Sequence, residues 1–379
     1  MSAGAGGAGR LTALLAVTFL AFVNYAAMLP VVPMWASVAG AASLSVGMTT
    51  GSMMAATVLT QLTAPWLFRL LRLRPMMILG AVLLAVPTPA YLLSGDMSWI
   101  LTITVVRGVG FALVVMAGAT LVADLAGPGR LSSSASLYGA AAALPNLGAL
   151  AGGVWVAQTW GFPVVFWVAG VAALLAAACA RALPGTARGA FALAALADLR
   201  RVVAPVGLFL LTAAAFGAAT TFLPLAGPGA AEASVALLVA SVALLLGRLG
   251  SGVVGDRVRA GRMLVPTVLL AAAGLATLAA ALRLSPALLP VGAAMLGAGF
   301  GACQNDSFVT TVQRLGPTRT APASTVWNAA YDGGLGLGAV VLGWVIGGAG
   351  YGSAFLVMAL SITGLALTIR LAGSRRSQR

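Results

Sequence analysis

The sequence predicts an all-α membrane protein with twelve transmembrane helices in two pseudo-symmetric six-helix bundles. Three observations lead to this fold class: the composition, the spacing of apolar runs, and a repeat between the two halves of the chain. Of the 379 residues, 61% are hydrophobic and 7% are charged, whereas about 25% are charged in ordinary soluble domains. The mean hydropathy is +1.04. These values exclude a single soluble core.

The number of helices follows from the spacing of the apolar runs. The hydrocarbon core of a bilayer is about 30 Å thick and a helix rises about 1.5 Å per residue, so one span needs about 20 apolar residues. Runs of this length are separated by polar residues, proline or glycine. They predict helices near residues 11–36, 44–68, 75–94, 98–123, 132–157, 162–181, 203–226, 233–254, 263–282, 287–312, 321–347 and 351–370.

The placement of the arginines predicts the orientation. Short cytoplasmic loops collect positive charge. With the N-terminus inside, all but three of the 21 basic residues fall on cytoplasmic segments; Arg283 lies outside, and Arg107 and Arg248 lie within the membrane. Both termini are therefore expected in the cytoplasm. The one extended polar connection predicts an N-terminal bundle at 1–182, a cytoplasmic linker at 183–202 and a C-terminal bundle at 203–379.

The two halves repeat each other in sequence. Residues 108–130, GVGFALVVMAGATLVADLAGPGR, align without gaps with residues 297–319, GAGFGACQNDSFVTTVQRLGPTR. Residues 22–33, FVNYAAMLPVVP, match residues 216–227, FGAATTFLPLAG. In this alignment helix 4 corresponds to helix 10, and helix 1 corresponds to helix 7. Both halves then start from the same side of the membrane, as in parallel repeats.

Loop motifs of the chain resemble those of the major facilitator superfamily. The loop after helix 8 reads GVVGDRVRAGR, similar to the family's Gly-x-x-x-Asp-Arg-x-x-x-Gly-Arg, with Asp256, Arg257 and Arg262 in place. The loop after helix 2, APWLFRLLRLR at 64–74, keeps arginines but has Phe68 in place of the aspartate. In the family this loop interacts with an acid at the inner end of helix 4. The resemblance thus implies a gating network of Arg69, Arg72, Asp124, Arg248, Asp256, Arg257 and Arg262.

Helices 4 and 5 add to this resemblance. The segment RGVGFA at 107–112 is similar to the family's arginine-plus-glycine segment. The segment LPNLGALAGG at 144–153 is similar to the glycine-rich motif of 12-span drug/metabolite:proton antiporters, with Gly148, Gly152 and Gly153 retained for helix packing and Ala149 in place of proline. The resemblance implies two bundles that rock about a central cavity lined mainly by helices 1, 4, 7 and 10.

Polar residues inside predicted helix 10 are the main candidate functional residues. An ionisable residue at membrane depth costs about 3 kcal/mol on insertion scales, so it usually marks a pathway or a paired partner. Gln304, Asn305 and Asp306 stand where the N-terminal half has Val-Met-Ala. We expect Asp306 to bind protons or substrate, and the two amides to contact substrate or neighbouring helices. The alternative is a permanent ion pair between Asp306 and Arg248.

Helix 11 contains a second intramembrane acid, Asp332, and one turn before it on the same face lies Asn328, which is expected to contact substrate. Asp332 is either a second proton site or a partner of a neighbouring backbone, and the sequence leaves both open. Arg107 is expected to attract an anionic or electron-rich substrate group or to compete with a proton for a carboxylate, the alternative being interhelical hydrogen bonds to carbonyls. Asn24 and Tyr25 in helix 1 are weaker candidates for substrate contacts. Aromatic residues that could line an apolar pocket are Phe22, Phe111, Trp155, Phe216, Phe300 and Trp327.

The motifs and the resemblance predict a proton-coupled secondary transporter that exports a small, largely apolar compound such as a drug or natural product. Uptake, exchange or sugar efflux of a small metabolite is the alternative. The expected partners are the small-molecule substrate, protons and the lipid bilayer. A monomer in the plasma (inner) membrane is expected.

Other function classes fit the sequence poorly. The chain has no histidine, no cysteine pair with metal-type spacing and no clustered carboxylates, so it lacks the usual parts of an enzyme or a metal site. No cofactor is expected, and no Gly-x-x-x-x-Gly-Lys-Ser/Thr loop is present for ATP. The arginines lie in short clusters between apolar runs, which argues against nucleic-acid binding.

Overall fold

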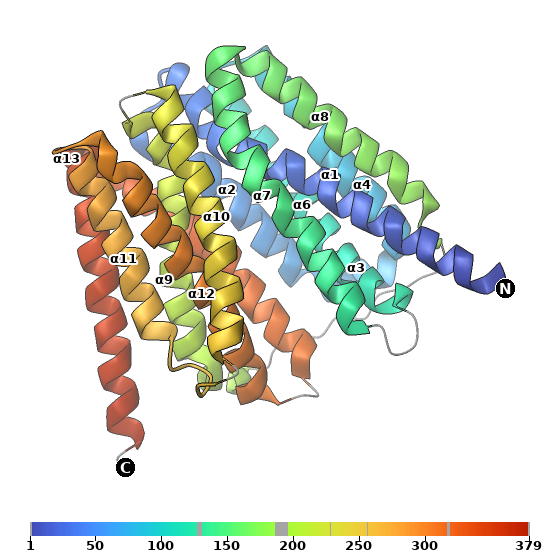
Figure 1. Ribbon diagram of the computed structural model, residues 1–379. Helices are drawn as coiled ribbons and strands as arrows, with labels where there is room; N and C mark the ends of the chain where they lie inside the picture. The colour runs from blue at the N-terminus through green and yellow to red at the C-terminus, as the bar shows by residue number, and fades with distance from the viewer. Residues whose placement is uncertain are drawn as a thin grey trace. The chain divides into compact units, whose positions relative to one another are not determined.

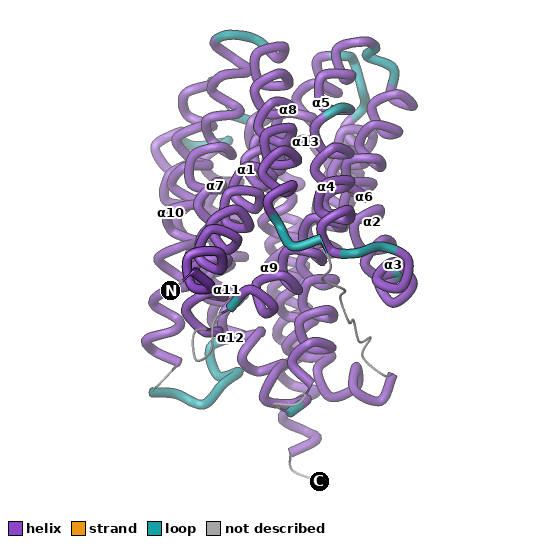
Figure 2. Tube along the Cα trace, turned by 90° about the vertical axis from the view of Figure 1, so that its right-hand side faces the viewer, coloured by secondary structure: helices purple, strands orange, loops and turns teal. Residues whose placement is uncertain are grey.

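The computed structural model describes residues 2–126, 131–185, 196–227, 229–255, 257–316 and 319–377, and within these ranges its regular elements are all helical (Figures 1 and 2). The predicted all-α fold is confirmed. By their contacts the residues form two compact units. Unit 1 comprises Met1–Trp35 and Ala55–Ala192, and unit 2 comprises Ala36–Met54 and Leu193–Arg379.

The helices of unit 1 match the predicted spans of the N-terminal half. The third span is interrupted, because Pro87 and Pro89 lack the N–H that a continuous helix needs. The first residues of the second helix, up to Met54, belong by their contacts to unit 2. The helices are α1 (Ser2–Val38), α2 (Ser43–Leu62), α3 (Ala64–Leu70), α4 (Leu73–Ala85), α5 (Pro87–Ala90), α6 (Met97–Leu125), α7 (Leu131–Thr159) and α8 (Phe162–Cys179), with a 3-10 turn at Tyr91–Leu93.

The helices of unit 2 also match the predicted spans. The last element, α13, consists of two helices that correspond to the last two predicted spans. They are separated at Gly350, whose φ of +72° and ψ of 169° are not helical. The predicted linker at 183–202 lies in part outside the described residues, so the domain boundary stays a prediction. The helices are α9 (Leu196–Ala226), α10 (Ala230–Gly255), α11 (Leu264–Ala281), α12 (Leu289–Leu315) and α13 (Thr320–Ser377).

Ten segments of the described chain are long and apolar enough to cross a membrane. One of them, Pro322–Leu371, contains both helices of α13. Helix α2 is not among them, and its 20 residues include three serines and four threonines. The chain is therefore a multi-pass integral membrane protein. The count of twelve crossings and the cytoplasmic position of the termini stay predictions.

Phenylalanines at aligned positions of the sequence repeat form similar pairs in the two units. In unit 1, the ring centroids of Phe22 in α1 and Phe111 in α6 are 5.3 Å apart. In unit 2, those of Phe216 in α9 and Phe300 in α12 are 4.6 Å apart. The sequence repeat thus corresponds to equivalent contacts between the first and fourth helices of each half.

Glycines bring α10 and α12 of unit 2 into backbone contact. Gly297 and Gly301 lie one turn apart on one face of α12. A Cβ added at Gly297 would overlap the carbonyl oxygen of Ala240, and one at Gly301 would overlap that of Leu244. Small residues with this spacing let helices approach closely in lipid, where no hydrophobic force drives them together. This contact fixes α12, the helix that contains Asp306, against α10.

Candidate functional site

Asp306 of α12 accepts two hydrogen bonds from the backbone of the loop between α10 and α11. The N–H of Gly261 donates to Oδ1 at 2.8 Å, and the N–H of Met263 donates to Oδ2 at 3.1 Å. The side chain is only 6% exposed. Hydrogen bonds to a charged acceptor are about twice as strong as neutral ones. Asp306 therefore holds the α10–α11 loop against α12.

Gly261 gives this loop the conformation that the contact requires. Its φ is +85°, in the left-handed region that side chains other than glycine rarely adopt. A Cβ at this position would also lie 3.3 Å from Oγ1 of Thr310 on α12. Glycine is therefore required at position 261, because only its backbone conformation turns the loop N–H groups toward Asp306.

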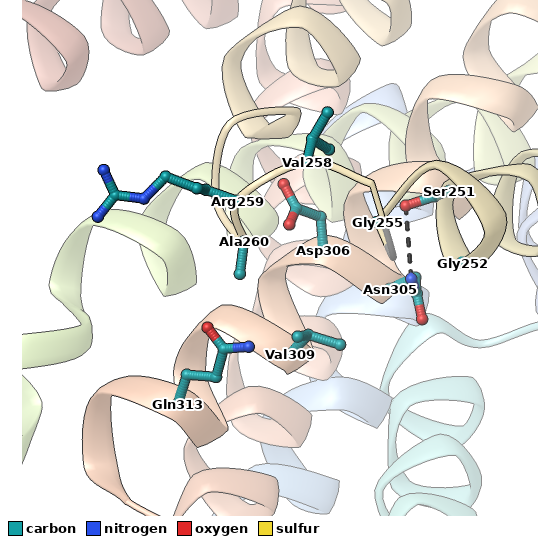
Figure 3. A pocket seen from close by; sticks show the side chains of 10 residues that line it. All are labelled: Ser251, Gly252, Gly255, Val258, Arg259, Ala260, Asn305, Asp306, Val309 and Gln313. Atoms are coloured by element: carbon teal, nitrogen blue, oxygen red, sulfur yellow. Dashed lines mark hydrogen bonds between the residues drawn. The ribbon is translucent and has the colours of Figure 1, made fainter.

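A cavity of about 530 Å³ lies beside Asp306 (Figure 3). It falls in the usual size range of ligand pockets, about 300–1,000 Å³. Figure 3 shows the Asp306 carboxylate turned toward the loop and the guanidinium of Arg259 pointing away from it. The cavity is lined by Ser251, Gly252 and Gly255 of α10, by the loop at 258–260, and by Asn305, Asp306, Val309 and Gln313 of α12. The site is thus formed within unit 2.

The two amides next to Asp306 have different surroundings. Asn305 donates from Nδ2 to Oγ of Ser251 at 3.5 Å, and that hydroxyl donates to the carbonyl of Ala302 at 3.1 Å. Asn305 therefore links α12 to α10 and also lines the cavity. Gln304 is 5% exposed and is absent from the cavity lining. Of the three adjacent polar residues, two face the cavity.

The sequence repeat predicts a loop partner at a position other than Asp306. In the gapless alignment Gln313 occupies the place of Asp124, the acid that the family resemblance associates with this loop. Gln313 is neutral and only lines the cavity. Asp306, seven residues earlier in α12, provides the carboxylate instead. The C-terminal half thus has a contact between a carboxylate and this loop, and the carboxylate lies about two helical turns before the position that the repeat predicts.

Arg248 is not the partner of Asp306. Both carboxylate oxygens of Asp306 bond with loop N–H groups. The Arg248 side chain is exposed. The expected alternative of a permanent Asp306–Arg248 ion pair is therefore wrong, because the carboxylate is turned toward the loop.

Asp332 of α13 is buried, with 4% of its side chain exposed. Asn328 donates from Nδ2 to the carbonyl oxygen of Ser324 at 2.9 Å, within its own helix. This bond satisfies one N–H of the amide, and Asn328 itself is half-buried. The role of Asn328 as a substrate contact and the role of Asp332 as a second proton site stay predictions.

Arg107 and Asn24 meet in a polar cluster in unit 1. Arg107 of α6 is 1% exposed. Its Nη2 donates to Oδ1 of Asn24 at 2.9 Å, and its Nη1 donates to the Tyr91 hydroxyl at 3.4 Å. Asn24 donates in turn to Oγ1 of Thr88 and to the carbonyl of Ala169. The observed contacts of Arg107 are therefore hydrogen bonds between helices, as in the alternative stated above. The acceptors are neutral side chains and not backbone carbonyls.

The guanidinium of Arg107 has no carboxylate among these partners, and its Nε has no hydrogen-bond partner. A buried charge without a counter-ion is costly. We expect Arg107→Met to keep or raise the thermal unfolding midpoint and to lower transport at least about tenfold, as removal of a functional charge would do. Thermal unfolding of the purified protein and transport by the same preparation check this. A parallel fall of both would assign Arg107 a structural role.

Tyr25 packs with aromatic residues of unit 1. Its ring stacks on Phe111 of α6 with centroids 4.0 Å apart and planes inclined by 7°. Phe22 contacts both rings edge-on. Since Tyr25 is only 2% exposed, this geometry supports a packing role. A substrate contact at Tyr25 stays a prediction.

The predicted gating residues of the first loop do not come together. Arg69, Arg72 and Asp124 are all exposed, and among the described residues none of them forms an ion pair with another. Arg72 donates instead to the carbonyl of Gly185 at 3.5 Å. In the second loop, Arg257 and Arg262 are exposed, and Asp256 lies outside the described residues.

Only one of the three glycines expected to pack in α7 has a close neighbour. A Cβ at Gly153 would lie 2.9 Å from the carbonyl oxygen of Ala27 in α1. Gly148 and Gly152 have nothing within 4 Å of the corresponding position. Within unit 1, close packing of α7 on α1 therefore rests on Gly153.

Sequence reasoning missed two groups of residues. Thr88 and Tyr91 complete the cluster around Arg107, and their polar groups in the apolar third span were a usable signal. Phe209 and Tyr331 join Phe300 and Trp327 in an aromatic cluster. Tyr331 stands four residues after Trp327 in α13, so the helical period was a usable signal for this pair. No pattern in the sequence indicated the contacts of Phe209, because they cross between helices.

The described geometry resembles that of known membrane transporters. The chain is similar to the solved structure of the nucleoside transporter NupG, with a TM-score of 0.77 at 12% identity, over 96% of this chain and 98% of that one. It is similar to a bacterial homologue of the human lysosomal transporter Spinster, with a TM-score of 0.77 at 15% identity over 96% of both chains. It is also similar to the solved structure of a D-xylose–proton symporter, with a TM-score of 0.73 at 14% identity, over 95% of this chain and 96% of that one. These likenesses show the fold.

A search among curated proteins finds no match to the sequence. Residues 14–331 match the Major Facilitator Superfamily. This match covers most of the chain and indicates a transporter rather than an enzyme. The structural likenesses agree with the fold of this family. The chain therefore belongs to the Major Facilitator Superfamily of membrane transporters.

Proposed function

We propose that the chain is a proton-coupled antiporter that exports a small, largely apolar compound by alternating access, as a monomer in the plasma (inner) membrane. The observation that carries the proposal is the buried Asp306 carboxylate, which binds two loop N–H groups beside a cavity of about 530 Å³. The partial antiporter motif in α7 supports export as the direction of transport.

Proton binding to Asp306 changes the interaction with the loop. The ionised carboxylate only accepts hydrogen bonds, whereas the protonated acid places a donor on one of its two oxygens. Both loop contacts come from N–H donors, so protonation weakens at least one of them. The two protonation states thus favour different positions of the loop, which is the difference that coupling requires.

The fold is compatible with proton coupling. A solved structure of the same fold is described as a D-xylose–proton symporter. In the described part of this chain, Asp306 is a buried acid whose hydrogen-bond partners are backbone N–H groups of a loop, which suits it to the same task. Asp332 is the second candidate because of its burial.

Purified protein reconstituted in liposomes tests the function. We expect an imposed pH gradient to drive accumulation of a fluorescent apolar compound against its concentration gradient, and a protonophore to abolish it. Liposomes without protein are the control. Transport that persists unchanged with the protonophore would refute proton coupling, and movement of substrate and protons in the same direction would refute antiport.

A further inference from the structure

The loop between α10 and α11 presents three arginines within six residues. Arg257, Arg259 and Arg262 are all exposed, and within the described residues none of their side chains has a hydrogen-bond or ion-pair partner. Figure 3 shows the guanidinium of Arg259 directed away from Asp306. The loop sequence contains one acid, Asp256. The loop therefore carries an excess of positive charge that the described part of the chain does not neutralise.

The backbone that carries these arginines is held in place by hydrogen bonds. The N–H of Arg257 donates to the carbonyl of Val254 at 2.9 Å, and the N–H of Arg262 donates to the carbonyl of Arg259 at 3.2 Å. Two further N–H groups of the loop donate to Asp306. A ligand of the guanidinium groups therefore has to order their side chains but not the loop, which lowers the entropic cost of binding.

A fourth arginine lies on α12 next to this loop. The loop packs against Thr310, because a Cβ at Gly261 would lie 3.3 Å from the Thr310 Oγ1. Arg314 follows Thr310 by four residues, on the same face of α12. It is exposed, and its Nη1 donates to the carbonyl oxygen of Arg201 at 3.2 Å, which is a neutral acceptor. Arg314 thus adds to the positive charge of the loop.

An exposed apolar face of α10 leads to the loop. Ala240 and Leu244 meet α12 through their backbones, and residues two positions further along lie about 200° around the helix. These residues are between 43% and 62% exposed, and their spacing of four, three and four keeps them on one face: Val242, Leu246, Leu249 and Val253. Acyl chains of lipids cover such a face in a spanning helix. Arg257 follows Val253 by four residues, so the apolar face ends where the arginines begin.

We propose that the loop between α10 and α11 binds the headgroup of an anionic phospholipid. The guanidinium groups of the loop bind its phosphate, whose oxygens match their planar donors, and its acyl chains lie along the apolar face of α10. Clusters of arginines at the cytoplasmic end of a spanning helix attract anionic lipids, and the arginine placement predicts this end of unit 2 to be cytoplasmic. The lipid is a bound partner and not the transported compound, so this inference goes beyond the proposed function.

Lipid binding to the purified full-length protein in micelles of a neutral detergent tests this site. The probes are phosphatidylglycerol and phosphatidylcholine with identical acyl chains, and the rise of the thermal unfolding midpoint with added lipid gives the affinity. We expect wild type to bind phosphatidylglycerol more tightly. Joint replacement of Arg257, Arg259 and Arg262 by glutamine should weaken phosphatidylglycerol binding at least about tenfold and leave phosphatidylcholine binding unchanged. Without lipid, this variant should unfold as wild type does.

Joint replacement of Arg10, Arg181 and Arg370 by glutamine is the matched control, because it removes the same charge at exposed positions outside the loop. It should bind phosphatidylglycerol as wild type does. Lysine at all three loop positions keeps the charge and should retain much of the affinity, which separates loss of charge from misfolding.

Three results would overturn the proposal. The first is equal affinity of wild type for the two lipids, and the second is an equal loss of phosphatidylglycerol binding in the two glutamine variants. The third is competition by soluble glycerol phosphate that is as strong as competition by the lipid, since the loop would then be a site for a free anion. No transport is measured, so each of these results leaves the proposed function standing.

Discussion

Replacing Asp306 with asparagine is expected to abolish proton-driven export while the protein remains folded. Asparagine has nearly the same shape, but its Nδ2 cannot accept the second loop N–H. One hydrogen bond of the pair is lost and the other is no longer charge-assisted, a change worth about 1.5–3 kcal/mol. The substituted residue also cannot bind and release a proton. The loop contact therefore no longer responds to protons.

Growth inhibition of an efflux-deficient host by a panel of toxic compounds measures this effect, with wild type and Asp306→Asn at matched protein levels. Protection by wild type alone is the expected result. Asp96→Asn makes the same chemical change at an exposed position before α6 and should protect as wild type does. Equal protection by Asp306→Asn would reduce Asp306 to a structural role, and no protection by wild type would argue against export of the compounds in the panel.

Replacing Gly301 with valine is expected to separate α10 from α12 and to lower stability strongly. Even the first carbon of a side chain there would overlap the carbonyl oxygen of Leu244. That atom belongs to the backbone of α10, so the helix itself must shift. Overpacking typically costs about 1–3 kcal/mol, and the present case lies at the upper end because no flexible side chain can yield.

The thermal unfolding midpoint of the purified protein, followed by size-exclusion chromatography, measures the cost. Gly250→Val is the matched control, since this exposed helical glycine of α10 has nothing within 4 Å of its Cβ position. It should unfold close to wild type. Equal midpoints for Gly301→Val and wild type would show that the two backbones are not in close contact.

The helices were predictable from the sequence because each apolar run is long and sharply bounded. The interruption at Pro87 and the break at Gly350 both stand in the printed sequence as residues that continue a helix poorly. The residues that occupy the sites were also predictable, because a polar side chain within an apolar run is conspicuous. Asp306 and Arg107 were identified in this way.

The partners of these residues were not predictable. Asp306 bonds with N–H groups 45 and 43 positions earlier in the chain, and backbone donors have no signature in the amino-acid letters. Charge pairing suggested Arg248 instead. Arg107 bonds with Asn24, 83 positions away, because of how α1 and α6 pack, which the helical period of either segment does not specify.

Asp306 recognises main-chain atoms, and this affects how the loop can change in evolution. Every residue other than proline has an N–H, so Met263 can be replaced by many side chains without loss of the contact. Gly261 and Asp306 cannot be replaced in this way, because one requires a particular backbone conformation and the other a carboxylate. Relatives of this protein should therefore diverge freely at position 263 and retain the pair at 261 and 306.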